Sequence, residues 1–337
     1  MKRLFKGGAR LRYNVLVFGV IRRCVMKRYL VTGVSGFVGQ HFLKYLDNVG
    51  ERIEVFGLDL VSGNYVPANY SYRFGVADIF ISGVVRNILA DFQPDYILHL
   101  AAISSVSESL NNPEKIMNNN ICSTIDLLSS IEAVVRGSCR ILVIGSSEVY
   151  GESDELLSET SPCFPRNPYA YSKLANESIV QSYCGKTNFD IIMTRSFMHT
   201  GTNQNEKFVI ASFVKQLFAA KCKNGQLAKL ATGNIDIFRD ITDVRDVVRA
   251  YYLLLQHGRH GEKYNVCSGT AVSLRSVIEL AGEILGVQVA IEIDTSRLRA
   301  NDLQLVVGNN EKIRNETGWQ PEIKLSQTLR DMIEGNF

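Results

Sequence analysis

The stretch "LVTGVSGFVG", Leu30 to Gly39, joins the end of an apolar run to three glycines at a spacing of three, Gly33, Gly36 and Gly39. Glycines in a turn between a strand and a helix let the backbone approach a pyrophosphate at the positive end of the helix. Glycine-rich turns also simply end strands, so the surrounding sequence has to decide between these two interpretations.

The sequence beyond this turn alternates between two patterns. Apolar runs rich in β-branched residues predict strands, and segments with helical periodicity separate them. The predicted strands cover residues 28–34, 53–60, 95–102, 140–147 and 190–197, and the predicted helices cover about 37–49, 79–92, 113–135 and 168–183. Continuous apolar strands that alternate with helices indicate an α/β fold with a doubly wound parallel sheet, the Rossmann arrangement.

The regular alternation weakens after Ser196, where a loop, a helix and a mixed helix–strand section follow. We therefore predict a dinucleotide-binding domain over residues 26–195, to which the chain returns at about 240–266. Residues 196–239 and 267–337 are expected to form a smaller C-terminal α/β cap that builds the substrate cleft.

Residues 1–25 differ from the rest of the chain, because they hold seven basic residues and no acidic one. Their apolar run "YNVLVFGVI" is too short to span a membrane as a helix and lacks a clear small-residue cleavage site. We expect an extension outside the fold, with a peripheral membrane contact as the alternative and a signal peptide as the least favoured interpretation. No integral membrane span is predicted.

Charge and cysteine content limit the classes of protein to consider. The chain of 337 residues has 37 Lys and Arg against 34 Asp and Glu. Without the seven basic residues of the N-terminal segment the balance is 30 to 34, a net charge of −4, so no basic field argues for nucleic-acid binding. The seven cysteines are scattered and never spaced as C-x-x-C, which indicates neither a disulfide framework nor a metal site and favours the cytoplasm.

Two carboxylates follow the predicted strands of the first half. Asp59 lies in "GLDL", twenty positions after Gly39, where a carboxylate can bind the hydroxyls of the adenosine ribose and repels a 2′-phosphate. NAD(H) is therefore the favoured cofactor, and NADP(H) remains possible. Asp78 in "GVADI" is either a partner of the adenine amino group or a helix N-cap.

The segment "NPYAYSKLANE", Asn167 to Glu177, places Tyr169 and Lys173 four apart on one face of a predicted helix. A phenol with an ordinary pKa of about 10 needs a nearby cation to act as an acid or base near neutrality. Ser146, at the strand end in "VIGSSEVYG", can hydrogen-bond the same substrate oxygen. Tyr171 is the competing phenol, but its spacing of two from Lys173 puts it on another face.

These motifs together resemble the extended short-chain dehydrogenase/reductase family, in its nucleotide-sugar-modifying branch, over residues 28 to about 335. The resemblance rests on "TGVSGFVG", on "HLAA" from His99 to Ala102, on Asn120 and on the set Ser146, Tyr169 and Lys173. It implies a homodimer through the helices that begin near Pro113 and Pro168. With Asp59 and Asp78, the implied cofactor-binding set is Gly33, Gly36, Phe37, Val38, Gly39, Leu100, Ala101, Ala102, Asn120, Tyr169 and Lys173.

Three later segments are similar to the subgroup of this family that acts on GDP-mannose and its derivatives: "FRDITDVRDVVRAYYLLL", "GEKYNVCSG" and "RLRANDLQLVVGNNEKIRNETGWQP". The similarity implies a GDP-sugar substrate whose diphosphate is bound by Arg239 and Arg299, since guanidinium forks suit phosphate oxygens. A surface salt bridge is the alternative for each arginine. Asp302 and Lys312 have either a binding or a structural role, and the implied substrate-binding set also includes Ser147, Glu148 and His199.

Two reactions of this subgroup are open. A 4,6-dehydratase needs a glutamate that removes the C5 proton, and Glu148 in "SSE" is compatible with that role. The loop "SFMHTGTNQNEKFV" is instead similar to the short pattern of the reductases. Met198, Thr202 and Asn203 depart from that pattern and leave the configuration of the product at C4 open. We favour NAD(P)H-dependent reduction of the C4 ketone of GDP-4-dehydro-6-deoxy-D-mannose to GDP-D-rhamnose or its C4 epimer.

In the reductase, the resemblance implies that Tyr169 donates a proton, Ser146 holds the ketone oxygen, and Lys173 lowers the pKa of the phenol and binds the nicotinamide ribose. Glu148 then has no proton to remove and is an orienting or vestigial group. The alternatives are a GDP-mannose 4,6-dehydratase, another nucleotide-sugar epimerase or reductase, and a dinucleotide sensor without turnover. The sensor is disfavoured because both Tyr169 and Lys173 are present.

Overall fold

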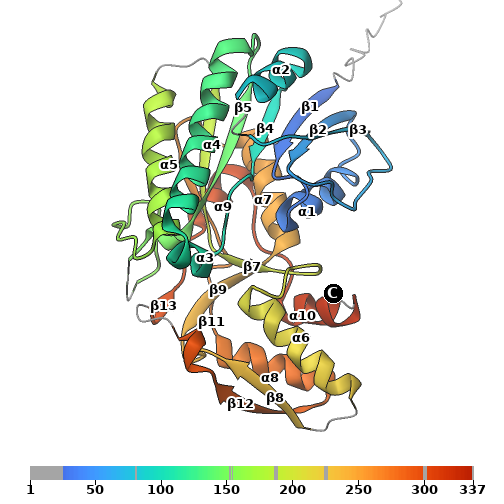
Figure 1. Cartoon of the computed structure of the whole chain (residues 1–337), viewed down its shortest axis with the longest axis vertical. Coiled ribbons are helices and arrows are strands. Elements are labelled where there is room, and N and C mark those ends of the chain that lie inside the picture. The colour runs from blue at the N-terminus through green and yellow to red at the C-terminus, as the bar shows by residue number, and fades with distance from the viewer. Residues whose placement is uncertain are drawn as a thin grey trace, which may run out of the picture.

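The computed structural model describes residues 26–79, 82–151, 153, 155–185, 189–223, 227–298 and 302–335. The expected N-terminal extension, residues 1–25, lies outside this part of the chain, and its role stays a prediction. The described residues form a larger layered α/β part and a smaller part that holds the C-terminal helix (Figure 1). None of the helices within the described ranges is long and apolar enough to cross a membrane.

The larger part is built on a seven-stranded parallel sheet with the order β10-β6-β5-β4-β1-β2-β3. Its strands are β1 (Lys27–Thr32), β2 (Ile53–Asp59), β3 (Ser71–Val76), β4 (Tyr96–His99), β5 (Arg140–Ser146), β6 (Asp190–Ser196) and β10 (Lys263–Val266). The strand order reverses between β1 and β4, and ligands of doubly wound sheets bind at the crevice beside such a reversal. The predicted doubly wound fold is confirmed.

Helices cover both faces of this sheet. Tyr29 and Val31 of β1 pack into a core with α1 (Phe37–Leu46) and α7 (Val244–His257). Leu30 lies in a second core that it shares with α2 (Ser82–Phe92), α4 (Pro113–Val134) and α5 (Pro168–Cys184). Successive side chains of a strand point to opposite faces, so burial on both faces explains why the strand sequences are continuously apolar.

The smaller part packs α6 (Val209–Cys222), α8 (Leu274–Leu285) and α10 (Leu325–Glu334) around an apolar core of its own. Its strands are β7 (Met198–Thr200), β8 (Leu227–Thr232), β9 (Phe238–Asp243), β11 (Ala271–Ser273), β12 (Gln288–Ile293) and β13 (Leu305–Val306). Strand β9 pairs with β7, β11 and β13, and β8 pairs with β12. We call this part the cap.

The chain returns to the large sheet where β10 pairs with β6. One segment lies elsewhere than expected. Ile313 of α9 (Glu311–Thr317) and Trp319 are buried in the core that contains Tyr29, and the Trp319 indole donates a hydrogen bond to the Asp246 carbonyl oxygen of α7 at 2.9 Å. This segment therefore packs on the larger part, and the remaining domain limits stay a proposal.

Two short elements lack a signal in the sequence. Strand β3 lies at the edge of the sheet and has no fully buried residue, so it shows no continuous apolar run. Helix α3 (Val106–Asn111) has only six residues, which is too short for a periodic pattern. The helix expected from residue 79 begins at Ser82, and the strand expected to reach 102 ends at His99.

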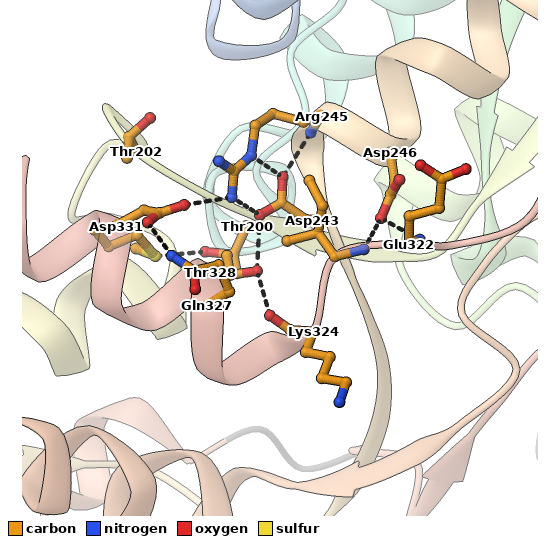
Figure 2. A network of polar contacts seen from close by, with 12 residues as sticks. Thr200, Thr202, Asp243, Arg245, Asp246, Glu322, Lys324, Gln327, Thr328 and Asp331 are labelled. Atoms are coloured by element: carbon orange, nitrogen blue, oxygen red, sulfur yellow. Dashed lines mark hydrogen bonds and ion pairs between the residues drawn. The ribbon is translucent and has the colours of Figure 1, made fainter.

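Polar contacts around Asp243 join the cap to the larger part (Figure 2). The buried Asp243 carboxylate accepts hydrogen bonds from Arg245 Nε at 2.9 Å and Nη2 at 2.7 Å, and from Thr328 Oγ1 of α10 at 2.7 Å. Arg245 Nη2 also pairs with Asp331 at 2.7 Å. The C-terminal helix is therefore held against the first turn of α7.

Candidate active site

A cavity of about 650 Å³ lies at the carboxyl ends of β1, β2, β4, β5 and β6 and is lined by both parts of the protein. One wall, the nucleotide end, consists of residues from 33–39, 58–61, 77–79 and 100–104. Another, the cap end, consists of residues from 196–208 with Arg239, Asp240 and Val306. Ser146, Tyr169 and Lys173 line the same cavity. The predicted nucleotide turn and the predicted Ser/Tyr/Lys set therefore meet in one place.

The glycine turn begins where β1 ends at Thr32 and finishes where α1 begins at Phe37. Gly33 has a φ of +70°, and a Cβ atom there would lie 2.7 Å from the Ala101 backbone nitrogen. A Cβ atom at Gly39 would lie 2.4 Å from the Val34 carbonyl oxygen. Side chains are excluded at both positions, and a cradle remains at the helix N-terminus that fits a pyrophosphate. Phe37 and Val38 also line it.

Asp59, the last residue of β2, lines the nucleotide end. Its carboxylate accepts hydrogen bonds from the backbone N–H groups of Ser35 at 2.8 Å and Leu60 at 2.7 Å. The group therefore shapes the glycine turn as well as facing the cavity. Among the described residues that line this end, none is a lysine or an arginine.

Asp78 and the segment from Leu100 to Ala102 line the same end. Helix α2 begins four residues after Asp78, so Asp78 does not directly precede its first residue. The segment after β4 is held by Thr32, whose hydroxyl accepts from the Ala101 N–H at 3.3 Å and pairs with His99 Nδ1 at 2.8 Å. Burial lowers the pKa of His99 to about 3, so this histidine is a neutral structural group.

Asn120 does not reach the cavity, although it was expected to bind the cofactor. Its side chain accepts from the Ile103 N–H at 2.9 Å and donates to the Ile103 carbonyl at 3.1 Å and to Ser172 Oγ at 3.0 Å. These three hydrogen bonds tie α4 to the loop after β4 and to α5. Asn120 thus supports the wall from behind, and its neighbour Asn119 lines it.

Ser146 comes from the end of β5, and Tyr169 and Lys173 come from the first turns of α5. Both α5 side chains are buried against the cavity, whereas Tyr171 is 54% exposed and does not line it. Ser146 acts on the Tyr169 hydroxyl and lowers its pKa, so the two side chains lie close together in the cavity. Lys173 Nζ donates to the Ile144 carbonyl oxygen at 2.8 Å and lies 5.8 Å from the centroid of the Tyr169 ring. The helix therefore presents one phenol and one ammonium to the cavity.

The protonation states of this set are determined mainly by burial. Burial raises the pKa of Tyr169 to about 12, the nearby Ser146 hydroxyl opposes this, and the Glu148 charge adds to it. Burial lowers the pKa of Lys173 to about 8. The net pKa of the phenol is therefore raised by burial, and the role of Lys173 in lowering it stays a prediction. Near neutrality the phenol is protonated and can donate a proton.

Ser147 and Glu148 lie in a short 3₁₀ turn (Ser147–Val149) directly after Ser146, and both line the cavity. The Glu148 N–H donates to Ser146 Oγ at 3.2 Å. The Glu148 carboxylate accepts from Asn167 Nδ2 at 3.0 Å. This carboxylate therefore stands at the cavity with one defined partner.

His199 lines the cap end from β7. Its Nδ1 lies 2.9 Å from the Phe197 carbonyl oxygen, which can only accept, so Nδ1 carries the hydrogen. Burial lowers the pKa of His199, which leaves Nε2 as an acceptor. The ring stacks on Phe37 with the centroids 6.3 Å apart. His41, on the same helix as Phe37, donates from Nε2 to the Thr202 carbonyl oxygen at 2.9 Å.

Arg239 lines the cap end and is held by several partners. Its Nη1 donates to the Leu303 carbonyl oxygen at 2.8 Å, and its Nη2 lies 3.9 Å from Asp302. Asp302 does not line the cavity and so contacts the arginine from behind. Lys312 donates to Glu262 at 2.6 Å, away from the cavity lining. Arg299 lies outside the described residues, and its role stays a prediction.

The lining also includes residues that were not singled out in the sequence, among them Ser35, Asn119, Gln204, Lys207, Phe208 and Tyr251. Most lie in segments of common polar residues whose types alone indicate no chemistry. Tyr251 lies in α7 and is hydrogen-bonded to Ser196, 55 positions away, at 2.7 Å, so no local pattern could reveal it. Among the residues that the structure describes, no cluster of His, Cys, Asp and Glu is placed to hold a metal ion.

A glycine turn at the head of a doubly wound sheet, with serine, tyrosine and lysine in the same cavity, defines an extended short-chain dehydrogenase/reductase. The model of one family, GDP-mannose 4,6 dehydratase, matches residues 30–332. The chain belongs to this family. The resemblance seen in the sequence is thereby confirmed.

Individual relatives cover nearly the whole chain. It is 35% identical over 312 residues to GDP-6-deoxy-D-mannose reductase of Pseudomonas aeruginosa, which covers 91% of this chain and 96% of that protein. The structure of RMD from Pseudomonas aeruginosa complexed with NADPH matches with a TM-score of 0.78 and 34% identity, over 92% of this chain and 97% of the other. The dTDP-glucose 4,6-dehydratase DesIV of Streptomyces venezuelae, with NAD bound, matches with a TM-score of 0.79 and 28% identity, over 91% and 96%. A nicotinamide dinucleotide is thus the cofactor class.

Proposed function

We propose that the protein uses a reduced nicotinamide dinucleotide to convert the C4 ketone of GDP-4-dehydro-6-deoxy-D-mannose to the alcohol of a GDP-6-deoxyhexose. The observation that carries the proposal is the protonated Tyr169 beside Ser146, in the cavity that contains the glycine turn. A proton donor next to a hydride source suits ketone reduction. Similarity to the Pseudomonas aeruginosa reductase supports the choice of sugar.

When bound, the cofactor supplies the hydride for the carbonyl carbon. The ketone oxygen is held by Ser146 Oγ and the Tyr169 hydroxyl, and Tyr169 transfers its proton as negative charge develops on that oxygen. The positive charge of Lys173, 5.8 Å from the ring centroid, stabilises the phenolate that remains. The Ile144 carbonyl holds the ammonium group in place for this task.

The cap end suits the remainder of the substrate. Arg239 reaches the cavity with its guanidinium fixed by the Leu303 carbonyl, as the binding of a diphosphate requires. His199 offers Nε2 as an acceptor for a sugar hydroxyl. A positive group for the phosphates and an acceptor for the sugar therefore lie on the same wall.

Glu148 favours a second candidate function, GDP-mannose 4,6-dehydration. Its carboxylate lines the cavity, and it would remove the C5 proton of a 4-ketone formed by oxidation. In that reaction the protein would begin with oxidised cofactor and would regenerate it within each turnover.

The two candidates are separated by two incubations of protein that has been freed of bound nucleotide. The first contains GDP-mannose and NAD⁺, and the second contains the 4-dehydro-6-deoxy sugar nucleotide and NADH or NADPH. We expect stoichiometric oxidation of the reduced cofactor in the second and no product in the first. Formation of the keto sugar in the first would establish the dehydratase instead.

We also propose that NAD(H) is preferred over NADP(H), because the Asp59 carboxylate faces the nucleotide end and repels a 2′-phosphate. Asp59→Asn should raise the ratio of kcat/KM with NADPH to kcat/KM with NADH about tenfold, the result of removing roughly 1.4 kcal/mol of repulsion. Asp78→Asn is the control for a lost carboxylate elsewhere on this wall. A wild-type enzyme that already prefers NADPH would contradict the proposal.

We further propose that the protein is a cytoplasmic homodimer whose subunits meet through α4 and α5. Ile125 of α4 and Tyr171 of α5 are exposed in the single chain and are therefore available for a contact between subunits. The six cysteines within the described ranges are free thiols, which supports a reducing compartment. Light scattering coupled to gel filtration tests the dimer, and Tyr171→Glu should shift it towards the monomer.

A further inference from the structure

Asn167 begins the helix that carries Tyr169 and Lys173. Its side-chain oxygen accepts from the Ala170 N–H at 2.8 Å, which caps the N-terminus of α5. Its Nδ2 donates to the Glu148 carboxylate at 3.0 Å. An amide side chain can do both at once because it carries an acceptor and two donors. One residue therefore joins the catalytic helix to the cavity carboxylate.

We propose that Asn167 is a positioning residue, which holds the Glu148 carboxylate at the cavity close to Ser146 and Tyr169 and thereby widens the pH range over which Tyr169 can donate its proton. The inference rests on the proposed role of Tyr169 as the proton donor. It gives Glu148 a task in a reductase, where no carbon-bound proton has to be removed.

The geometry fixes Glu148 at both ends. Its backbone N–H is bound to Ser146 Oγ at 3.2 Å, and its carboxylate is bound to Asn167. Ser146 lines the same cavity as Tyr169 and lowers the pKa of its phenol. Glu148 is otherwise an exposed side chain, and a free glutamate samples many rotamers. Asn167 thus restricts the negative charge to one position relative to the phenol.

The groups around Tyr169 leave Glu148 as the charge that opposes ionisation of the phenol. On its own helix Tyr169 faces Lys173, whose pKa is lowered to about 8 by burial. From α7 it faces Tyr251, whose pKa burial raises well above the ordinary value. From β4 the neighbour of Lys173 is His99, whose pKa is about 3. Near neutrality Tyr251 and His99 are both uncharged. The negative charge of Glu148 raises the pKa of Tyr169.

A double-mutant cycle tests this coupling. Asn167→Ser retains a favoured N-cap residue but cannot donate to the distant carboxylate, and Glu148→Gln removes the charge but can still accept from Asn167. The wild type, both single variants and the double variant are compared in the pH profile of kcat for reduction of the keto sugar. Thermal unfolding checks that α5 remains intact, and Asn167→Thr is a second variant of the same design.

The wild type should lose part of its activity where Lys173, with a pKa of about 8, becomes neutral, and the rest at higher pH, where the phenol ionises and can no longer donate. The second loss is the one compared among the four proteins. In Glu148→Gln the alkaline loss of activity should move to lower pH by about half a unit to one unit, the effect of removing one nearby charge. Asn167→Ser should move it in the same direction by less, and the double variant should match Glu148→Gln. Additive shifts, no shift in Asn167→Ser, or loss of activity at every pH in Glu148→Gln would overturn the proposal.

A measurement without substrate keeps this test separate from the proposed function. Protein labelled with ¹³C at the phenol carbon of tyrosine is titrated by NMR, and the Tyr169 signal is assigned with Tyr169→Phe. The ionisation of Tyr169 should follow the same order across the four proteins. If the keto sugar is not reduced but this order is found, the reductase proposal fails and the positioning role stands. An unchanged titration in Asn167→Ser refutes the positioning role.

Discussion

The nucleotide end of the cavity presents backbone groups and small residues, whereas the cap end presents long polar side chains. At the nucleotide end, a Cβ atom at Gly33 or Gly39 would lie 2.7 Å or 2.4 Å from neighbouring backbone atoms. At the cap end, His199, Lys207 and Arg239 reach the cavity from loops and short strands. The first wall therefore selects its ligand by shape, and the second by charge and hydrogen bonding.

This difference between the walls predicts that substitutions in them will have different effects. A side chain added to the nucleotide end collides with backbone that cannot move without disturbing the sheet. A side chain removed from the cap end leaves the fold intact and takes away one partner of the substrate. Tyr169 belongs to neither wall, because its proposed role is to donate the proton in the reaction.

The largest effect is expected from Tyr169→Phe, which keeps both walls and removes only the proton donor. Turnover should fall by about 10²–10⁴-fold, the range typical of general acids, while the dissociation constant for NADH stays within about twofold. Stopped-flow turnover and fluorescence titration measure the two quantities. Tyr171→Phe on the exposed face of α5 is the matched control and should be active. A Tyr169→Phe variant within tenfold of wild type would show that another group supplies the proton.

Gly39→Ala tests the nucleotide end alone. Its Cβ would press on the Val34 carbonyl oxygen, and overpacking of this kind costs about 1–3 kcal/mol, so NADH should bind about tenfold more weakly or worse. The affinity for the sugar nucleotide should remain close to that of the wild type. Gly83→Ala in α2 is the control, because a Cβ there meets nothing within 4 Å. Equal weakening of both ligands would remove the distinction between the walls.

Arg239→Met tests the cap end in the same manner. Loss of a charge-assisted contact should raise KM for the GDP-sugar about tenfold or more, from roughly 1.5–3 kcal/mol, with NADH affinity unchanged. Arg275→Met is the control, since Arg275 pairs with Asp236 at 2.8 Å on the surface of the cap. Weaker binding of NADH in Arg239→Met would mean that the guanidinium serves the cofactor.

The smallest effect is expected at the junction between the cap and the larger part of the protein. Thr328→Val removes the hydroxyl that donates to the buried Asp243 carboxylate, and the free energy of unfolding should fall by about 1–3 kcal/mol. Denaturant unfolding measures it, with the exposed Thr295→Val as the control. Ligand affinities at both walls should stay near wild type. A selective loss of sugar-nucleotide affinity would show that α10 also supports the cap end.

The nucleotide end and the pair Tyr169 and Lys173 could largely be predicted from the sequence, because their features are local. The glycine spacing, the strand end at Asp59 and the i, i+4 pair of Tyr169 and Lys173 are each contained in a short segment. Asn120 is the exception, because its side-chain amide is hydrogen-bonded to Ile103 and Ser172 behind the wall. Such satisfaction of a buried polar group depends on tertiary contacts.

The cap end could be predicted only through the resemblance to a family. His199 and Arg239 carry no local pattern of their own. Tyr251 of α7 lines the cavity next to Ser196 of β6, to which it is hydrogen-bonded across 55 positions of sequence. The raised pKa of Tyr169 was also missed, because burial is a property of the assembled structure. Long-range packing, which a single sequence does not display, accounts for these differences.

Helix α1 belongs to the nucleotide end, yet it also supports the loop that follows β7. Phe37 stacks on His199, and His41 donates to the Thr202 carbonyl oxygen. A sugar-binding loop transplanted from a relative would therefore keep its conformation here only if its backbone offered a carbonyl group to His41. Recombination aimed at new sugar specificity in this scaffold should exchange residues 37–41 and 198–208 as one unit.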